Sequence, residues 1–255
     1  MGTSWWRSPA VVVLVTTALI GTGAPAANLT LPVSTADVRD TASTTTHGAL
    51  PGAPVGALFT GGRHFCTASV VGSPGGDLVL TAAHCVPAGA PQDLYFAPGF
   101  HDGVAPFGMW QVTAVHVPAG WAAGADQDLD FAFLTVHQAG TPRPVQYLTG
   151  AETLGVDRGP AHDIVLTGYP DGVDSPVICP GRTTGFGAHQ QRVACPGFPD
   201  GTSGGPWPAA VDPATGNGTV VGVVGGYQQG GDTPDVSYSA TFDQDIQDTY
   251  DAAVR

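Results

Sequence analysis

The amino-acid sequence predicts an all-β fold made of two β-barrel halves, followed by one C-terminal helix. Glycine and proline are abundant, with 37 and 23 among 255 residues, and both favour tight turns between short strands. Runs of β-branched and aromatic residues recur on both sides of a Pro/Gly-rich segment, residues 139–150. Strands do not alternate with helical patterns, which argues against a doubly wound parallel sheet.

The expected strands are short apolar runs bounded by turn residues such as Ser73-Pro-Gly-Gly76. The first half is expected to hold strands at residues 55–59, 66–71, 77–81, 110–117 and 131–136. The second half is expected to hold strands at residues 164–169, 219–224 and 235–241. The one helix is expected at residues 244–254.

Composition limits the classes of partner. Hydrophobic residues make up 42% of the chain and charged residues 11%, so the chain is able to bury a core. The net charge of −13 disfavours nucleic acid, which requires a basic surface, and it also disfavours anionic membranes. We therefore expect a soluble, self-repelling monomer.

The N-terminus has the features of a secretory signal peptide over residues 1–26. Arg7 precedes an apolar run at residues 10–20, and Ala24-Pro-Ala26 provides small residues for cleavage. The apolar run is shorter than the ~20 residues of a membrane span, so we expect secretion without a membrane anchor. Residues 27–54 are expected to be a propeptide or a flexible leader, and residues 55–255 the folded domain.

Export places the four cysteines in an oxidising compartment. Four cysteines allow three pairings, of which the local one is the simplest. It joins Cys66 to Cys85 and Cys179 to Cys195. Each bridge is expected to contribute ~3 kcal/mol by the chain-entropy estimate.

A serine flanked by glycines is the sharpest chemical signal, in Asp200-Gly-Thr-Ser-Gly-Gly-Pro206. Such a turn exposes the hydroxyl of Ser203, and the N–H groups of Gly201 and Ser203 are expected to form an oxyanion hole. The same residues also fit the G-x-S-x-G elbow of α/β-hydrolases. In those enzymes the histidine follows the serine, but here no histidine lies beyond His189.

A second signal is His84, which directly follows an apolar strand and adjoins Cys85. An imidazole that must reach both a hydroxyl and a carboxylate needs a rigid position, and a neighbouring disulfide provides one.

Thr81-Ala-Ala-His-Cys85 together with Gly201-Thr-Ser-Gly-Gly-Pro206 resembles the trypsin/chymotrypsin-like serine peptidase family. Thr202 before the serine is similar to the bacterial secreted branch, which includes glutamyl endopeptidases. The resemblance runs from about Val55 to the C-terminus. It implies a chymotrypsin-like fold of two six-stranded antiparallel β-barrels, a Cys66–Cys85 disulfide, and a serine endopeptidase acting on protein or peptide substrates.

The resemblance further implies a Ser-His-Asp triad that works through an acyl-enzyme, with no cofactor and no metal. Ser203 is expected to be the nucleophile and His84 the general base. Asp126, Asp128 and Asp130 are all available as the third member. The family pattern is an Asp that opens an apolar strand, and Asp130-Phe-Ala-Phe-Leu-Thr-Val136 fits it best.

The family pattern also places a substrate pocket. Its base is expected at Gly197, where trypsins carry Asp, and its wall at Gly225, Gly226 and Tyr227. A Lys/Arg preference is therefore not supported. Glutamyl endopeptidases carry a histidine on this wall, where Val224 stands here, so a Glu preference is not supported either.

Two other classes of function remain as alternatives. One is a non-catalytic binding module on the same fold, which the three filled triad positions disfavour. The other is a metal site built from His64, Cys66, His84 and Cys85. Their spacing is unlike that of zinc ligands, and export favours disulfides.

Overall fold

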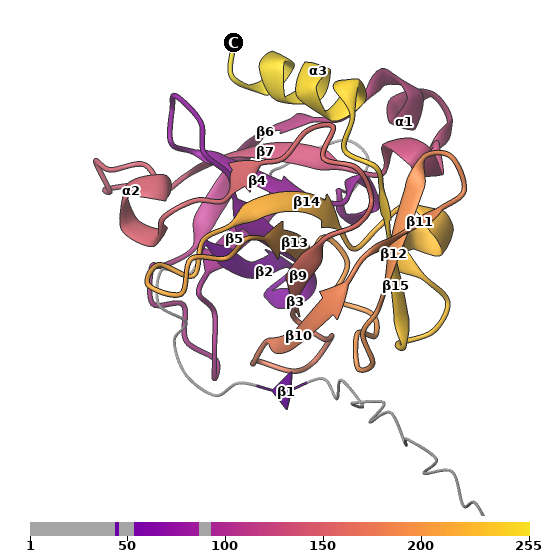
Figure 1. Ribbon diagram of the computed structural model, residues 1–255. Coiled ribbons are helices and arrows are strands. Elements are labelled where there is room, and N and C mark those ends of the chain that lie inside the picture. The colour runs from indigo at the N-terminus through magenta and orange to yellow at the C-terminus, as the bar shows by residue number, and fades with distance from the viewer. Residues whose placement is uncertain (1–43, 46–53, 87–92) are drawn as a thin grey trace, which may run out of the picture. The chain divides into compact units, whose positions relative to one another are not determined.

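A closed barrel of six antiparallel strands forms the first half of the fold (Figure 1). The computed structural model describes residues 44–45, 54–86 and 93–255, all within the unit Asp40–Arg255. Neighbouring barrel strands follow the order β2-β3-β4-β7-β6-β5. They are β2 (Val55–Thr60), β3 (Arg63–Val70), β4 (Leu78–Thr81), β5 (Tyr95–Pro98), β6 (Trp110–His116) and β7 (Ala132–His137).

The interior of this barrel is filled by large apolar side chains. Leu58, Phe96 and Leu134 are fully buried, and Trp110 is 2% exposed. Side chains of alternate residues in a strand point to opposite faces, so these positions face inward while their neighbours face outward. Closure of the barrel gives a rigid frame, and the loops at its rim project from fixed points.

The second half consists of two sheets. The larger follows the order β1-β10-β9-β13-β14-β8, and the smaller the order β11-β12-β15. The strands are β1 (Thr44–Thr45), β8 (Thr153–Leu154), β9 (Asp163–Gly168), β10 (Val177–Arg182), β11 (Thr184–Phe186), β12 (Gln190–Ala194), β13 (Pro206–Ala209), β14 (Thr219–Val223) and β15 (Val236–Ala240).

The expected second six-stranded barrel is not confirmed, because no continuous hydrogen-bond ladder closes these two sheets. Between β14 and β15, Val223 N–H donates to the Ser239 hydroxyl rather than to a backbone carbonyl. Beyond the end of β14, Gly225 N–H donates to Tyr238 O at 2.9 Å. The sheets also depart from a purely antiparallel pattern, since β8 pairs with β14 in parallel. The mostly-β architecture with a C-terminal helix is otherwise as predicted.

In the part of the chain that the structure describes, helices are few and short except at the C-terminus. The expected terminal helix is α3 (Gln244–Ala253), and the Asp243 side chain caps it by accepting from Asp245 N–H. The others are η1 (Ala83–Cys85), α1 (Ala119–Gly124), η2 (Gln127–Leu129), α2 (Gln146–Thr149) and η3 (Tyr227–Gly230).

Helix α3 returns to the first barrel and packs beside β6 and β7 (Figure 1). The rings of Tyr250 and Phe133 lie 5.7 Å apart, and the Tyr250 hydroxyl donates to Gly72 O at 2.9 Å. Ile246 is fully buried in a core shared by both halves. This helix therefore ties the end of the chain to the first half.

The expected signal peptide, residues 1–26, lies outside the described residues, as does most of the expected leader, residues 27–54. Within that leader, Thr44 and Thr45 form β1 and pair with Ile178 and Val177 of β10. Among the described residues, no helix is long and apolar enough to cross a membrane.

Candidate active site

His84 lies at the rim of the first barrel, where β4 ends. All four residues of β4 are buried, and the chain then turns into the single 3-10 turn η1 that carries His84. Cys85 forms a disulfide with Cys66 of β3. The turn is therefore fixed to two neighbouring strands, and the imidazole of His84 keeps 12% exposure.

Asp130 is the acidic residue that the fold brings to His84. It lies between η2 and β7 and is fully buried. Its Oδ2 lies 2.8 Å from His84 Nδ1, and its Oδ1 accepts from His84 N–H at 2.9 Å. Gly226 N–H, from the second half, also donates to Oδ2 at 2.8 Å. Three donors thus compensate this carboxylate for its removal from water.

This geometry assigns the proton of the imidazole. Nδ1 faces a carboxylate oxygen, which only accepts, so in neutral His84 the proton sits on Nδ1. Nε2 then has a free lone pair, and the ring is able to accept a proton at that atom.

The two alternative acids have other roles. The Asp126 side chain accepts from Asp128 N–H at 3.1 Å and caps η2. The Asp128 side chain accepts from Gln190 Nε2 at 2.7 Å. No hydrogen bond joins either carboxylate to His84 in the part of the chain that the structure describes.

Ser203 belongs to a tight loop of the second half that presses against the first barrel. Gly204 has φ +78°, and a Cβ there would lie 2.1 Å from Thr81 Oγ1 and 2.2 Å from Thr67 O. Only glycine fits this contact. The close approach brings Ser203 to the rim that carries His84.

The peptide groups of this loop are held by their carbonyls. Asp200 O accepts from Asp171 N–H at 2.8 Å, and Thr202 O accepts from Gly205 N–H at 2.9 Å. In a trans peptide the N–H points opposite to the C=O, so the N–H groups of Gly201 and Ser203 are turned away from these partners. Neither has an acceptor among the described residues. Their expected role as an oxyanion hole stays a prediction, with which these unpaired N–H groups are compatible.

Ser203 and His84 line one cavity of about 460 Å³, together with Phe65, Gly201 and Gln229. No hydrogen bond joins the Ser203 hydroxyl to the imidazole within the described residues. The hydroxyl has no other hydrogen-bond partner there and is free to rotate.

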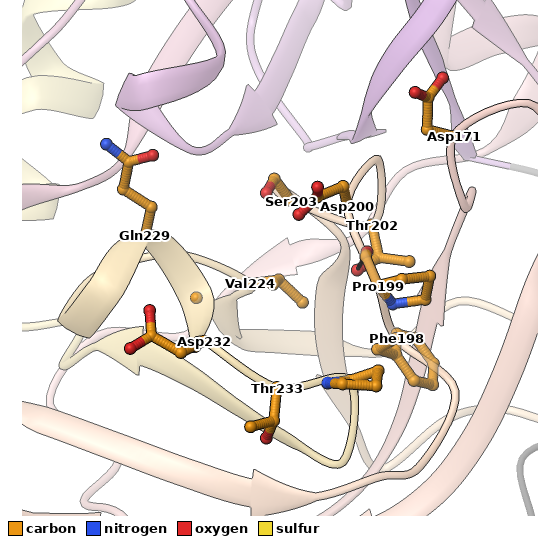
Figure 2. Close-up of a pocket in the computed structure, with 13 residues that line it drawn as sticks. Asp171, Phe198, Pro199, Asp200, Thr202, Ser203, Val224, Gln229, Asp232 and Thr233 are labelled. Atoms are coloured by element: carbon orange, nitrogen blue, oxygen red, sulfur yellow. Dashed lines mark hydrogen bonds between the residues drawn. The ribbon is translucent and has the colours of Figure 1, made fainter.

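A second cavity, of about 380 Å³, opens beside Ser203 (Figure 2). Ser203 and Asp200 lie on one side of it and Gln229 and Asp232 on the other. Phe198 and Val224 give it a buried apolar wall. Its position next to Ser203 makes it the candidate pocket for a substrate side chain.

The four residues expected to form this pocket do not line it. Gly225 packs against Asp130, and Gly226 is engaged with the same carboxylate. The Tyr227 ring lies 5.0 Å from Phe186 and 5.1 Å from Tyr238, in an aromatic cluster. Gly197 is replaced in the lining by its neighbours Phe198 and Pro199.

Three aspartate residues are among those that line this cavity. Asp171, Asp200 and Asp232 line it, whereas the lining contains no arginine, lysine or histidine. Cations are scarce in the whole chain, which has a net charge of −13. Sequence reasoning did not place Asp200 in the pocket, although it opens the Asp200-Gly-Thr-Ser-Gly-Gly-Pro206 motif, and it did not find Asp232, which stands in no motif.

The sulfur atoms near His84 are not available to a metal. The ligand atoms of Cys66, His84 and Cys85 lie within 4.8 Å of one another, but the two sulfurs form a disulfide. The second disulfide joins Cys179 of β10 to Cys195, just beyond β12, and so links the two sheets of the second half. The local pairing predicted from the sequence is confirmed.

Residues 66–223, more than half of the chain, match the family model of the trypsin-like peptidase domain. The chain belongs to the trypsin-like peptidase family. It is therefore a serine endopeptidase by family, and the resemblance noted in its motifs is confirmed.

Solved structures of bacterial and other proteases share the fold of this peptidase. Protease Anisep from Arthrobacter nicotinovorans is 24% identical, with a TM-score of 0.69 over 83% of this chain and 99% of that chain. The thermostable serine protease AL20 from an extremophilic microorganism is 25% identical, with a TM-score of 0.68 over 80% and 97%. A Glu endopeptidase in complex with MPD is 18% identical, with a TM-score of 0.65 over 84% and 97%. No curated protein sequence matches this peptidase.

Proposed function

We propose that this peptidase cleaves protein or peptide substrates with Ser203 as nucleophile, His84 as general base and Asp130 as the carboxylate that orients His84. The observation that carries the proposal is the 2.8 Å contact between His84 Nδ1 and buried Asp130, at a cavity that Ser203 also lines. It leaves Nε2 of His84 as a base beside a hydroxyl.

The reaction follows from these positions. Ser203 Oγ attacks the peptide carbonyl while His84 Nε2 takes the hydroxyl proton. His84 then gives this proton to the leaving amine as the C–N bond breaks, which leaves an acyl group on Ser203. A water molecule attacks the ester with His84 again as base, and the serine is restored. Asp130 stabilises the positively charged imidazolium in both steps.

The oxygen of the tetrahedral intermediate gains a negative charge during each attack. The unpartnered N–H groups of Gly201 and Ser203 supply two donors for it. One such donor typically contributes ~3–4 kcal/mol to transition-state stabilisation. The described residues show no hydrogen bond between Ser203 and His84, which line one cavity, and this fits the scheme because catalytic hydrogen bonds are often long until substrate binds.

The same proposal includes secretion as a monomer. Two disulfides are typical of an oxidising compartment outside the cytosol. The acidic surface disfavours self-association through charge repulsion. Expression in a secreting host followed by N-terminal sequencing of the exported protein tests the cleavage after residue 26, and light scattering tests the monomer.

The test of the activity is covalent labelling of the exported protein with a fluorophosphonate, together with hydrolysis of fluorescently labelled casein. We expect an adduct on Ser203 in the wild type and none in Ser203→Ala, which also loses hydrolysis. Ser73→Ala, in the turn before β4, is the matched control and is expected to behave as wild type. A folded wild-type protein that takes no label and cuts no casein would instead support the non-catalytic binding module.

A further inference from the structure

Thr67 reaches the Ser203 loop from the opposite half of the molecule. It follows Cys66 in β3 and is fully buried. Its backbone N–H donates to Ser203 O at 2.7 Å, and its own carbonyl accepts from the Thr81 hydroxyl at 2.8 Å. The first barrel therefore holds Thr67 firmly, and Thr67 in turn holds the loop.

The hydroxyl of Thr67 makes two further contacts with the second half. Tyr169 N–H lies 2.8 Å from Oγ1, and Oγ1 lies 3.1 Å from Gly201 O. A backbone N–H only donates and a carbonyl only accepts, so both directions are determined. The hydroxyl accepts from Tyr169 and gives its single proton to Gly201.

These contacts fix the residue whose N–H is to bind the oxyanion. Gly201 has φ +91°, and a Cβ there would lie 2.3 Å from Asp171 N and 2.6 Å from Tyr169 O. On its N-terminal side, Asp171 holds the carbonyl of Asp200. On its C-terminal side, Thr67 Oγ1 holds the carbonyl of Gly201 itself. The peptide planes on both sides of Gly201 are thus oriented. The Gly201–Thr202 plane is held by a side chain, that of Thr67.

We propose that the Thr67 hydroxyl is a positioning residue, which orients the Gly201–Thr202 peptide so that the N–H groups of Gly201 and Ser203 converge on one oxygen. The proposal rests on the function proposed above. Without the hydroxyl, the Gly201 carbonyl and Tyr169 N–H are left buried without partners, and the loop is expected to rotate to satisfy them. The two N–H groups then point in different directions.

The test compares steady-state kinetics of Thr67→Val, Thr67→Ser and wild type on the fluorogenic peptide that the wild type cuts fastest. Valine keeps the shape and removes the hydroxyl, and serine keeps the hydroxyl. For Thr67→Val we expect kcat to fall about 10-fold to 100-fold with KM within twofold, since donors misplaced by an ångström forfeit much of their effect. Thr67→Ser is expected to stay within threefold of wild type.

A second readout separates positioning from mere destabilisation. A peptide aldehyde forms a hemiacetal with Ser203 whose oxygen occupies the anion site. Its affinity for Thr67→Val is expected to fall by the same factor as kcat/KM, while the affinity for the cleaved product peptide stays unchanged. Thr149→Val is the matched control, because Thr149 is also buried and its hydroxyl lies within hydrogen-bond distance of the carbonyls of Val145 and Gly150, which flank α2, a segment that contributes no residue to the site.

The proposal is overturned if folded Thr67→Val retains kcat, if only KM changes, or if Thr149→Val loses as much kcat. If Thr67→Val does not fold, Thr67→Cys decides by the same criteria, because a thiol of similar size is a poor donor. The fluorophosphonate result on wild type and Ser203→Ala is independent of these variants. If the wild type is labelled and active and Thr67→Val is equally active, the role proposed for Thr67 is wrong but the proposed peptidase function stands.

Discussion

His84 donates two hydrogen bonds to Asp130, one from ring Nδ1 at 2.8 Å and one from its own backbone N–H at 2.9 Å. The pair is therefore held as one unit, with the ring and the main chain of the histidine bound to the two oxygens of one buried carboxylate. The first prediction concerns this pair.

Asp130→Asn is expected to lower kcat by about 10⁴, the effect that the same change has in the family's triad. Both carboxylate oxygens of Asp130 accept hydrogen bonds, whereas an asparagine has one oxygen and one NH2 group. The NH2 group would face a donor, so the imidazole of His84 loses its productive tautomer. Burst kinetics and thermal melting measure activity and folding separately. Asp128→Asn is the control and should stay active; an equal loss there, or an active Asp130→Asn, would refute the assignment.

Gly201→Ala is expected to lower kcat/KM by about 10²-fold to 10³-fold, the typical cost of losing one oxyanion donor. The new Cβ has no room beside Asp171 and Tyr169, so the loop must shift. Gly187→Ala is the matched control, since Gly187 also has positive φ, +67°, but nothing lies within 4 Å of its Cβ position. If both variants lose activity equally, the strain of alanine at positive φ explains the effect, rather than a displacement of the Ser203 loop.

Acidic side chains on the acyl side of the cut are expected to be poor substrates, because three carboxylates and no cation line the candidate pocket. Two peptides that differ only in Glu or Gln at this position compare charge at constant shape. We expect kcat/KM for Glu to be at least about tenfold lower, with the gap shrinking in Asp232→Asn and at high salt. A faster reaction with the Glu peptide would show that the aspartates lining the cavity do not determine selectivity.

Glu152 is expected to make stability depend on pH. Burial raises the pKa of its carboxyl from 4.5 to about 7, although Gly218 N–H, 2.6 Å from Oε2, partly offsets this. Below pH 4.5 the group is protonated in both folded and unfolded chains. Between pH 4.5 and about 7, unfolding releases a proton, so the free energy of unfolding falls as pH rises, by about 3 kcal/mol in total.

Glu152→Gln removes the charge and keeps the acceptor for Gly218. Urea titrations from pH 4 to 8 should show a falling midpoint in wild type and a flatter profile in the variant, which should also be the more stable protein above pH 7. An unchanged slope in Glu152→Gln would assign the pH dependence to other groups.

The strands that sequence reasoning found are those with uninterrupted apolar or alternating patterns, such as β4 and β7. Strands β10 and β13 were missed because they contain Pro180, Pro206 and Pro208. Proline removes a ladder donor and reads as a turn in the sequence. Tertiary pairing overrides that signal, at the cost of a register shift between Pro206 and Pro208.

The residues proposed to carry chemistry stood in motifs, and His84 and Asp130 are in contact as the resemblance implied. The expected pocket at Gly197, Gly225, Gly226 and Tyr227 stays a prediction, although the cavity beside Ser203 is lined by nearby residues such as Phe198 and Val224. Gln228 and Gln229 adopt left-handed φ values of 53° and 54°, which turn the chain out of the β14 direction into η3. Thr67 carries no sequence signal, since only the docking of two halves reveals its contacts.

The Asp130 carboxylate is bound by His84 from the first half and by Gly226 from the second. A half-folded chain therefore lacks both the aligned base and the supported serine loop. On the proposed function, a chain whose two halves have not yet docked would be unable to cut, and activity would appear only when folding is complete.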